Sequence, residues 1–111
     1  MSNKEIIVKF YEEFFNAHDV SAALRYVRED YIQHNPTVPQ GRQGLMDCFE
    51  GKFAEHPEFH LEIQMVIEEG DMVAVYQHSM SPEGKPQTKI VDWYRFEDGM
   101  LAEHWDVLQA I

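Results

Sequence analysis

The sequence predicts an α+β fold in which N-terminal helices pack on one face of a curved, mostly antiparallel sheet. The first half of the 111-residue chain has apolar residues at helical spacing, and the second half alternates apolar and polar residues with a period of two. Helices that precede a run of strands favour an α+β arrangement over alternating βαβ units. The length suits a single domain spanning residues 1–111, and a sheet that curves around helices can leave a pocket inside.

The first helix is predicted to begin at a capping box formed by Ser2 and Glu5 and to end near His18. Its apolar stripe comprises Ile7, Phe10, Tyr11, Phe14 and Phe15. We expect Tyr11 and Phe15 to belong to the core rather than to a binding site. His18 is expected to be structural, because a cation suits the negative end of the helix dipole.

Two further helices are predicted. Asp19 can cap a short one, with these residues facing inward: Val20, Ala23, Leu24 and Val27. The other runs from about Arg42 to His56, and its buried side comprises Leu45, Phe49 and Phe53. Gly44 and Gly51 weaken this second helix, because glycine has a low helix propensity.

The remaining elements are predicted strands. A brief extended segment, Tyr31–Asn35, is stopped by Pro36. Residues 59–67 alternate with a period of two, and their apolar positions are Phe59, Leu61, Ile63, Met65 and Ile67. Met72–Met80 is nearly continuously apolar, as in a central strand, and a hairpin that turns at Asp98-Gly99 follows it.

The register of this hairpin decides which residues share a face with Asp92. Residues 97–99 fit a three-residue loop, a type I turn followed by glycine in the left-handed region. This loop pairs Phe96 with Met100, Tyr94 with Ala102, Asp92 with His104, and Ile90 with Asp106. A two-residue turn would instead place Trp105 opposite Asp92. We favour the longer loop, because the shorter type I′ turn needs a positive φ at Asp98 as well as at Gly99.

The favoured register also places Trp93 and Trp105 together on the face opposite Asp92. No helix is predicted to cover that face, so the two tryptophans form an exposed apolar patch. Such patches usually mark an interface. We therefore expect a homodimer that packs through this outer face of the sheet.

The composition excludes several kinds of partner. Nine basic and twenty acidic residues give a formal net charge of −11, which repels nucleic-acid phosphates and anionic membrane surfaces. No apolar run approaches the ~20 residues of a membrane span, and the one near the N-terminus is too short for a signal peptide. Cys48 is the only cysteine, so no internal disulfide or cysteine-based metal cluster can form. We expect a soluble cytoplasmic protein.

Four parts of the sequence carry a family resemblance. YIQHNP (Tyr31–Pro36), Gly41, VDWYRFEDG (Val91–Gly99) and EHWD (Glu103–Asp106) resemble SnoaL-like polyketide cyclases of the nuclear-transport-factor-2-like superfamily. The similarity covers nearly the whole chain. It implies a cone-shaped α+β barrel, usually dimeric, with a pocket between sheet and helices. It also implies cofactor-free ring closure by intramolecular aldol condensation, with one aspartate as acid and base.

The resemblance and the residue chemistry together nominate a site. By its position in the motif, Asp92 resembles the family's acid/base aspartate, and Asn35 and His78 resemble its pocket partners. A carboxylate in an apolar pocket can remove a proton next to a carbonyl, and histidine or asparagine donors can stabilise the enolate. Asp92 and His104 are the catalytic candidates. The substrate-binding candidates are His34, Asn35, His78, Tyr94 and Asp106.

Alternatives remain open for these residues. Asp92 could be an aspartate satisfied by hydrogen bonds or by a neighbouring His104, and Asn35-Pro36 is an ordinary turn initiator. Zinc could be held by His34, His78, His104 and Asp92, but we expect neither a metal nor a cofactor. The leading hypothesis is an aldol-type or isomerase-type enzyme acting on a hydrophobic, carbonyl-containing small molecule. The alternative is a non-catalytic domain of the same fold that binds a small molecule or dimerises.

Overall fold

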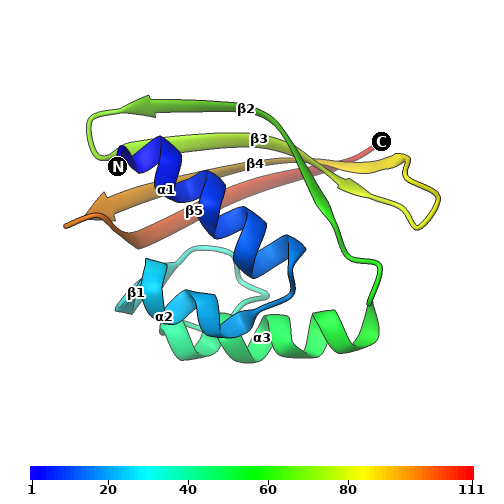
Figure 1. The fold of residues 1–111 in the computed structure, drawn as a ribbon, viewed down its shortest axis with the longest axis horizontal. Coiled ribbons are helices and arrows are strands. Elements are labelled where there is room, and N and C mark those ends of the chain that lie inside the picture. The colour runs from blue at the N-terminus through cyan, green and yellow to red at the C-terminus, as the bar shows by residue number, and fades with distance from the viewer.

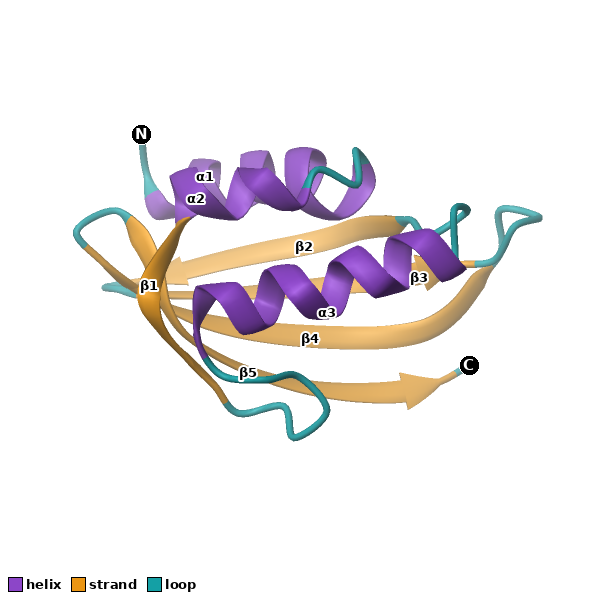
Figure 2. Ribbon diagram, turned by 90° about the horizontal axis from the view of Figure 1, so that it is seen from below, coloured by secondary structure: helices purple, strands orange, loops and turns teal.

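The helices of the protein lie on one face of a single five-stranded sheet (Figures 1 and 2). The structure is a computed structural model that describes residues 1–111. In chain order the elements are α1 (Asn3–Phe10), a π-helix (Tyr11–Asn16), a 3₁₀ turn (Val20–Ala22), α2 (Ala23–Tyr26), β1 (Val27–Gln33), α3 (Gly41–Glu55), β2 (Leu61–Glu69), β3 (Met72–Met80), β4 (Pro86–Glu97) and β5 (Met100–Ala110). The predicted α+β class is confirmed.

The sheet has the strand order β1-β5-β4-β3-β2. Only the pairing of β1 with β5 is parallel, and the other three pairings are antiparallel. Figure 2 shows the long strands curving behind α1 and α3, so that the concave inner face of the sheet meets the helices. The predicted, mostly antiparallel sheet is therefore confirmed.

The first helix begins at the predicted capping box, in which Ser2 accepts a hydrogen bond from the Glu5 backbone and the Glu5 side chain accepts one from Ser2. After Phe10 the helix widens into one π-helical segment. A π-turn holds one more residue than an α-turn, which helps to point Tyr11 and its aromatic neighbours inward together. The π-helical segment begins at Tyr11, whose hydroxyl contacts Asp92 on the sheet.

The segment after the first helix is short and irregular. Asp19 caps it, as predicted, by accepting a hydrogen bond from the Ser21 backbone. The expectation that Leu24 faces inward is wrong, because its side chain is 54% exposed. Ala23 and Val27 are buried as predicted, and Ala22, which lies in the 3₁₀ turn with its three residues per turn, is buried with them.

The third helix follows its predicted bounds closely and buries Leu45 and Phe53. Gly44 has a packing role there. A Cβ atom at this position would lie 2.7 Å from the backbone oxygen of Pro39, so only glycine permits the close approach of the preceding loop. Gly44 weakens the helix by propensity but is required here by the close approach of Pro39.

Strand β2 departs from the simple alternation predicted for it. Its pairing with β3 shifts between Ile63 and Met65, which leaves an extra residue in β2. Beyond this bulge Met65 and Ile67 are 55% and 58% exposed, whereas Val66 is partly buried. The two apolar side chains therefore lie on the outer face of the sheet.

The β4–β5 hairpin corrects the favoured register. Asp98 and Gly99 have φ angles of 52° and 74°, so the turn is the two-residue form that was considered less favourable. Aspartate tolerates the left-handed region better than most residues, which permits this turn. The register then shifts between Arg95 and Phe96, so that Tyr94 pairs with His104 and Asp92 with Asp106. The predicted pairs are wrong, yet the bulge still returns Asp92, His104 and Asp106 to one inner face.

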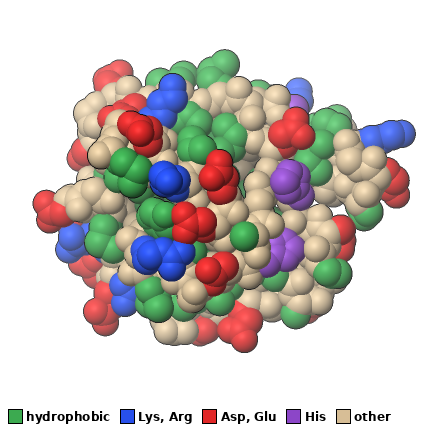
Figure 3. Space-filling view, viewed as in Figure 1, with side chains coloured by type: hydrophobic (Ala, Val, Ile, Leu, Met, Phe, Trp, Pro, Cys, Tyr) green, Lys and Arg blue, Asp and Glu red, His purple; other side chains and the backbone are tan.

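The molecular surface carries mixed charge. Figure 3 shows acidic side chains spread over the face on which α1 lies, with basic side chains among them. No continuous basic patch appears on that face, in keeping with the net charge of −11. None of the helices is both long and apolar enough to cross a membrane.

Candidate active site

A cavity of about 240 Å³ lies between the inner face of the sheet and the helices, and 11 of its 20 lining residues are hydrophobic. Aromatic side chains from the first helix and α3, such as Phe15 and Phe49, form part of the wall. Eight polar lining residues come from β1, β3, β4, β5 and the loop after β1: Gln33, Asn35, Gln77, Ser79, Thr88, Asp92, His104 and Asp106. An apolar cavity with a few convergent polar groups is typical of a ligand site.

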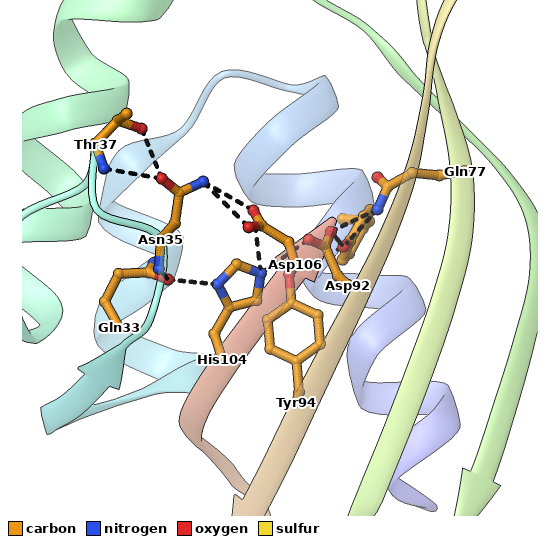
Figure 4. A network of polar contacts seen from close by, with 9 residues as sticks. Gln33, Asn35, Thr37, Gln77, Asp92, Tyr94, His104 and Asp106 are labelled. Atoms are coloured by element: carbon orange, nitrogen blue, oxygen red, sulfur yellow. Dashed lines mark hydrogen bonds and ion pairs between the residues drawn. The ribbon is translucent and has the colours of Figure 1, made fainter. Parts of the chain in front are cut away.

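Asp92 is the centre of this polar group, and its side chain is almost completely buried. Its Oδ1 lies 2.8 Å from Nε2 of His104. Its Oδ2 accepts hydrogen bonds from the Tyr11 hydroxyl and from Nε2 of Gln77. Figure 4 shows Gln77 and His104 approaching the carboxylate from neighbouring strands. The carboxylate is thus held in place by groups from the first helix, β3 and β5.

Two buried tyrosines extend the network away from Asp92. The hydroxyl groups of Tyr11 and Tyr94 lie 2.9 Å apart. Because the Tyr11 proton points to Asp92, Tyr94 donates to Tyr11. Burial raises the pKa of both tyrosines well above 10.0, and the negative charge of Asp92 raises it further. Both hydroxyl groups therefore stay protonated and remain donors at neutral pH.

The protonation of His104 follows from its hydrogen bonds. Its Nδ1 lies 2.6 Å from Oε1 of Gln33, and that oxygen also accepts a hydrogen bond of 3.0 Å from the Asn35 backbone N–H. Since Gln33 Oε1 is an acceptor, Nδ1 of His104 must carry a proton. The contact between Nε2 and Asp92 then needs one more proton to be a hydrogen bond. Asp92 and His104 therefore share a single proton at the cavity wall.

Asp106 is held in the same wall by Asn35. Nδ2 of Asn35 donates to both carboxylate oxygens of Asp106, at 3.2 Å and 3.0 Å. The amide cannot turn over, because Oδ1 of Asn35 accepts from the backbone and the hydroxyl of Thr37 (Figure 4). Asp106 also lies 3.9 Å from Nε2 of His104. The loop after β1 thus fixes the orientation of a second carboxylate next to the first.

Asp92, His104 and Asp106 offer ligand atoms that lie within 4.8 Å of one another, which makes them the residues that could hold a metal ion. A cation bound by all three would displace the proton that joins Asp92 to His104. The wider zinc set considered from the sequence does not converge, because His34 and His78 do not line the cavity.

The expectation that His34 and His78 face the pocket is wrong. His34 bonds Glu103 at 2.7 Å and stacks on Trp105, with ring centroids 4.8 Å apart, outside the cavity. His78 contacts the hydroxyl of Tyr76, which lies two residues before it on the same face of β3. Residues alternate between faces along a strand, so a cavity-facing Gln77 turns His78 outward.

The structure adds residues that the sequence did not single out. Tyr11 and Gln77 donate hydrogen bonds to Asp92, and Gln33 is hydrogen-bonded to His104. Tyr11 is a core residue, as expected, but its hydroxyl also belongs to the site. Gln77 interrupts the apolar run of β3, and a polar residue at such a position is the sequence feature that could have identified it as a site residue. Of the predicted residues, Asp92, His104, Asn35, Tyr94 and Asp106 line the cavity.

Comparison with protein families gives a match over nearly the whole chain. Residues 5–111 match the family described as SnoaL-like polyketide cyclase. A comparison with curated protein sequences finds no match.

Solved structures share the fold at low sequence identity. A candidate isomerase of the SnoaL-like family from Agrobacterium tumefaciens is 16% identical, with a TM-score of 0.82 and coverage of 98% of this chain and 99% of that one. An uncharacterised cystatin-fold protein from Novosphingobium aromaticivorans is 26% identical, with a TM-score of 0.81 and coverage of 96% and 98%. IdmH, a candidate polyketide cyclase from Streptomyces antibioticus, is 20% identical, with a TM-score of 0.76 and coverage of 98% and 93%.

Proposed function

Because this chain belongs to the SnoaL-like polyketide cyclase family, we propose that it is a cofactor-free acid/base enzyme acting on a small carbonyl compound. The reaction is proton abstraction next to the carbonyl, followed by aldol-type ring closure or by isomerisation. The cavity of about 240 Å³ is smaller than the roughly 300–1,000 Å³ of common ligand pockets, which favours a substrate of one or two rings.

One observation carries this proposal: a buried carboxylate, Asp92, lies 2.8 Å from Nε2 of His104 in the wall of a mostly apolar cavity. Groups held in this way can serve acid/base chemistry, because hydrogen bonds fix their positions in advance.

The chemistry assigns a role to each group. Asp92 takes a proton from the carbon next to the carbonyl, so that a C–H bond breaks and an enolate forms. His104, held by Gln33, supports the carboxylate and the developing negative charge. In ring closure the enolate carbon attacks a second carbonyl of the same molecule, and Asp92 returns the proton to the new alkoxide. In isomerisation the proton returns to another carbon. Asn35, Tyr94 and Asp106 bound the space in which the substrate is held.

Deuterium exchange distinguishes this enzyme from the alternative, a non-catalytic binding domain. The simple ketone 1-tetralone in D₂O exchanges the protons next to its carbonyl when a base removes them, and proton NMR follows the loss of that signal. We expect the protein to accelerate this exchange far above buffer containing equal concentrations of free imidazole and acetate. Binding of the ketone without accelerated exchange would favour the binding domain.

The outer face of the sheet supports a second part of the proposal, a homodimer. Paired residues on neighbouring strands share a face, so two rows cross β2, β3, β4 and β5 on this side. The rows are Ile67-Ala74-Trp93-Trp105 and Met65-Tyr76-Val91-Val107. The bulge in β2 therefore places Met65 and Ile67 on the same outer face as the two tryptophans, which enlarges the apolar surface. No helix covers these rows (Figure 2), and the partner we propose is a second copy of the chain.

A charge placed in this face is expected to separate the dimer. Trp93 is 38% exposed in the middle of one row, and Trp93→Glu would bury an unpaired carboxylate in the interface. Sedimentation analysis should show a dimer for the wild type and a monomer for Trp93→Glu. The matched control is Leu24→Glu, an exposed apolar residue on α2, which should remain dimeric. A monomeric wild type at micromolar concentration would rule out the dimer.

A further inference from the structure

One buried atom at the site is left without a partner. Oε1 of Gln77 has no hydrogen bond, although the residue is completely buried. Buried carbonyl oxygens in folded proteins are almost always paired, so such an exception calls for a physical reason.

The orientation of the Gln77 amide is fixed by its neighbours. Its Nε2 donates to Oδ2 of Asp92 and, at 3.1 Å, to the Tyr11 hydroxyl. Asp92 offers only acceptors there, and the single Tyr11 proton already points to Asp92. Turning the amide over would bring Oε1 against both oxygens. The unpaired atom is therefore the oxygen, and Figure 4 shows it turned away from Asp92.

The residues paired with Gln77 across the sheet offer no donor. On the inner face it pairs with Ile63 of β2 and Ile90 of β4, and Ile90 pairs with Leu108 of β5. All the side chains in this row except Gln77 are aliphatic. Gln77 borders the cavity, and because its Oε1 has almost no exposed surface, a hydroxyl group in the cavity reaches this oxygen only when a neighbouring side chain shifts aside.

We propose that Oε1 of Gln77 is a subsite that accepts a hydrogen bond from a hydroxyl group of the substrate. The amide joins this oxygen to the nitrogen that contacts Asp92, so the hydroxyl lies within a few bonds of the carbon that loses its proton. The substrate class is thus a hydroxylated ketone, with the hydroxyl near the reacting carbon. The inference rests on the proposed function and adds the substrate group that Gln77 recognises.

Three matched ketones test this subsite by calorimetric binding, without any need for turnover. They are 4-hydroxy-1-tetralone, its methyl ether 4-methoxy-1-tetralone, and 1-tetralone, which lacks the group. We expect the wild type to bind the hydroxyl compound about tenfold more tightly than the methyl ether, because only the hydroxyl donates to the buried oxygen. Gln77→Met should reduce this ratio to near one. Ser79→Ala and Thr88→Val, which change other polar residues of the cavity, should preserve it.

A second readout uses the wild-type protein alone. The ¹³C resonance of the Gln77 side-chain carbonyl should move when 4-hydroxy-1-tetralone binds and stay in place when the methyl ether binds. This measurement stands even if Gln77→Met weakens the fold by removing a donor to Asp92. Equal affinities, or an unmoved carbonyl resonance, would overturn the subsite and leave the proposed function intact. Failure of all three ketones to bind would overturn the carbonyl pocket as well.

Discussion

Asparagine at position 92 is expected to leave the free energy of unfolding within about 1 kcal/mol of the wild type, whereas alanine should lower it by about 3 kcal/mol. The amide oxygen of asparagine can accept from Tyr11 and Gln77, as the carboxylate does. Its NH₂ can donate to Nε2 of a neutral His104, whose only proton then lies on Nδ1 toward Gln33. Alanine satisfies none of these groups and leaves buried donors unpaired.

Urea unfolding of the wild type, Asp92→Asn and Asp92→Ala at pH 7 checks this prediction. The matched control is Asp47→Asn and Asp47→Ala, at an exposed aspartate of α3, where both changes should be small. If asparagine destabilised the protein as much as alanine does, the hydrogen-bond directions inferred around His104 would be wrong. Asp92 would then be a structural ion-pair partner rather than a replaceable acceptor.

Alkaline pH is expected to destabilise the protein steeply, through three buried tyrosines. Burial first, and the charge of Asp92 second, raise the pKa values of Tyr11, Tyr31 and Tyr94 well above 10.0. Below pH 10 these groups are protonated in both the folded and the unfolded chain. Above it only the unfolded chain ionises readily, so stability is lost as the pH rises toward the folded-state pKa values. Each tyrosine lowers the free energy of unfolding by up to about 1.4 kcal/mol per pH unit, so the three together lower it by up to about 4 kcal/mol per pH unit.

Unfolding free energies measured between pH 9 and pH 11 test this dependence. Tyr31→Phe should reduce the slope by about one third, and it is the mildest of the three changes because the Tyr31 hydroxyl enters no hydrogen bond of the network. Tyr76→Phe is the control, since Tyr76 lies on the outer face and is only partly buried. A stability that stays flat through this range would show that the three hydroxyl groups are not kept from ionising.

Local sequence signals were sufficient for much of the fold. The capping box at Ser2, the apolar run of β3 and the stop of α3 before Pro57 are each specified by residues close in sequence. The bulges in the β2–β3 and β4–β5 pairings were not predictable in this way. Each depends on how two strands fit around the helices, and each changes which side chains face the cavity.

The site was predictable only in part, for the same reason. The inward position of Asp92 follows from its apolar neighbours on β4, and the family resemblance assigned its role. Whether His34 and His78 point into the cavity depends on the strand register, and the residues next to them in sequence do not determine that register. The hydroxyl of Tyr11 gave no signal, because a tyrosine on an apolar helical stripe resembles any core aromatic residue until the partner strand is placed.

The measurement that bears most directly on the proposed acid/base role of Asp92 is the deuterium exchange of 1-tetralone by the wild type and Asp92→Asn, side by side. Asparagine preserves the shape and the hydrogen bonds of the site but cannot take up a proton. We predict that Asp92→Asn still binds the ketone and that its exchange rate falls by about 100-fold or more. A variant that binds 1-tetralone and exchanges its protons at the wild-type rate would contradict the assignment of Asp92 as the base.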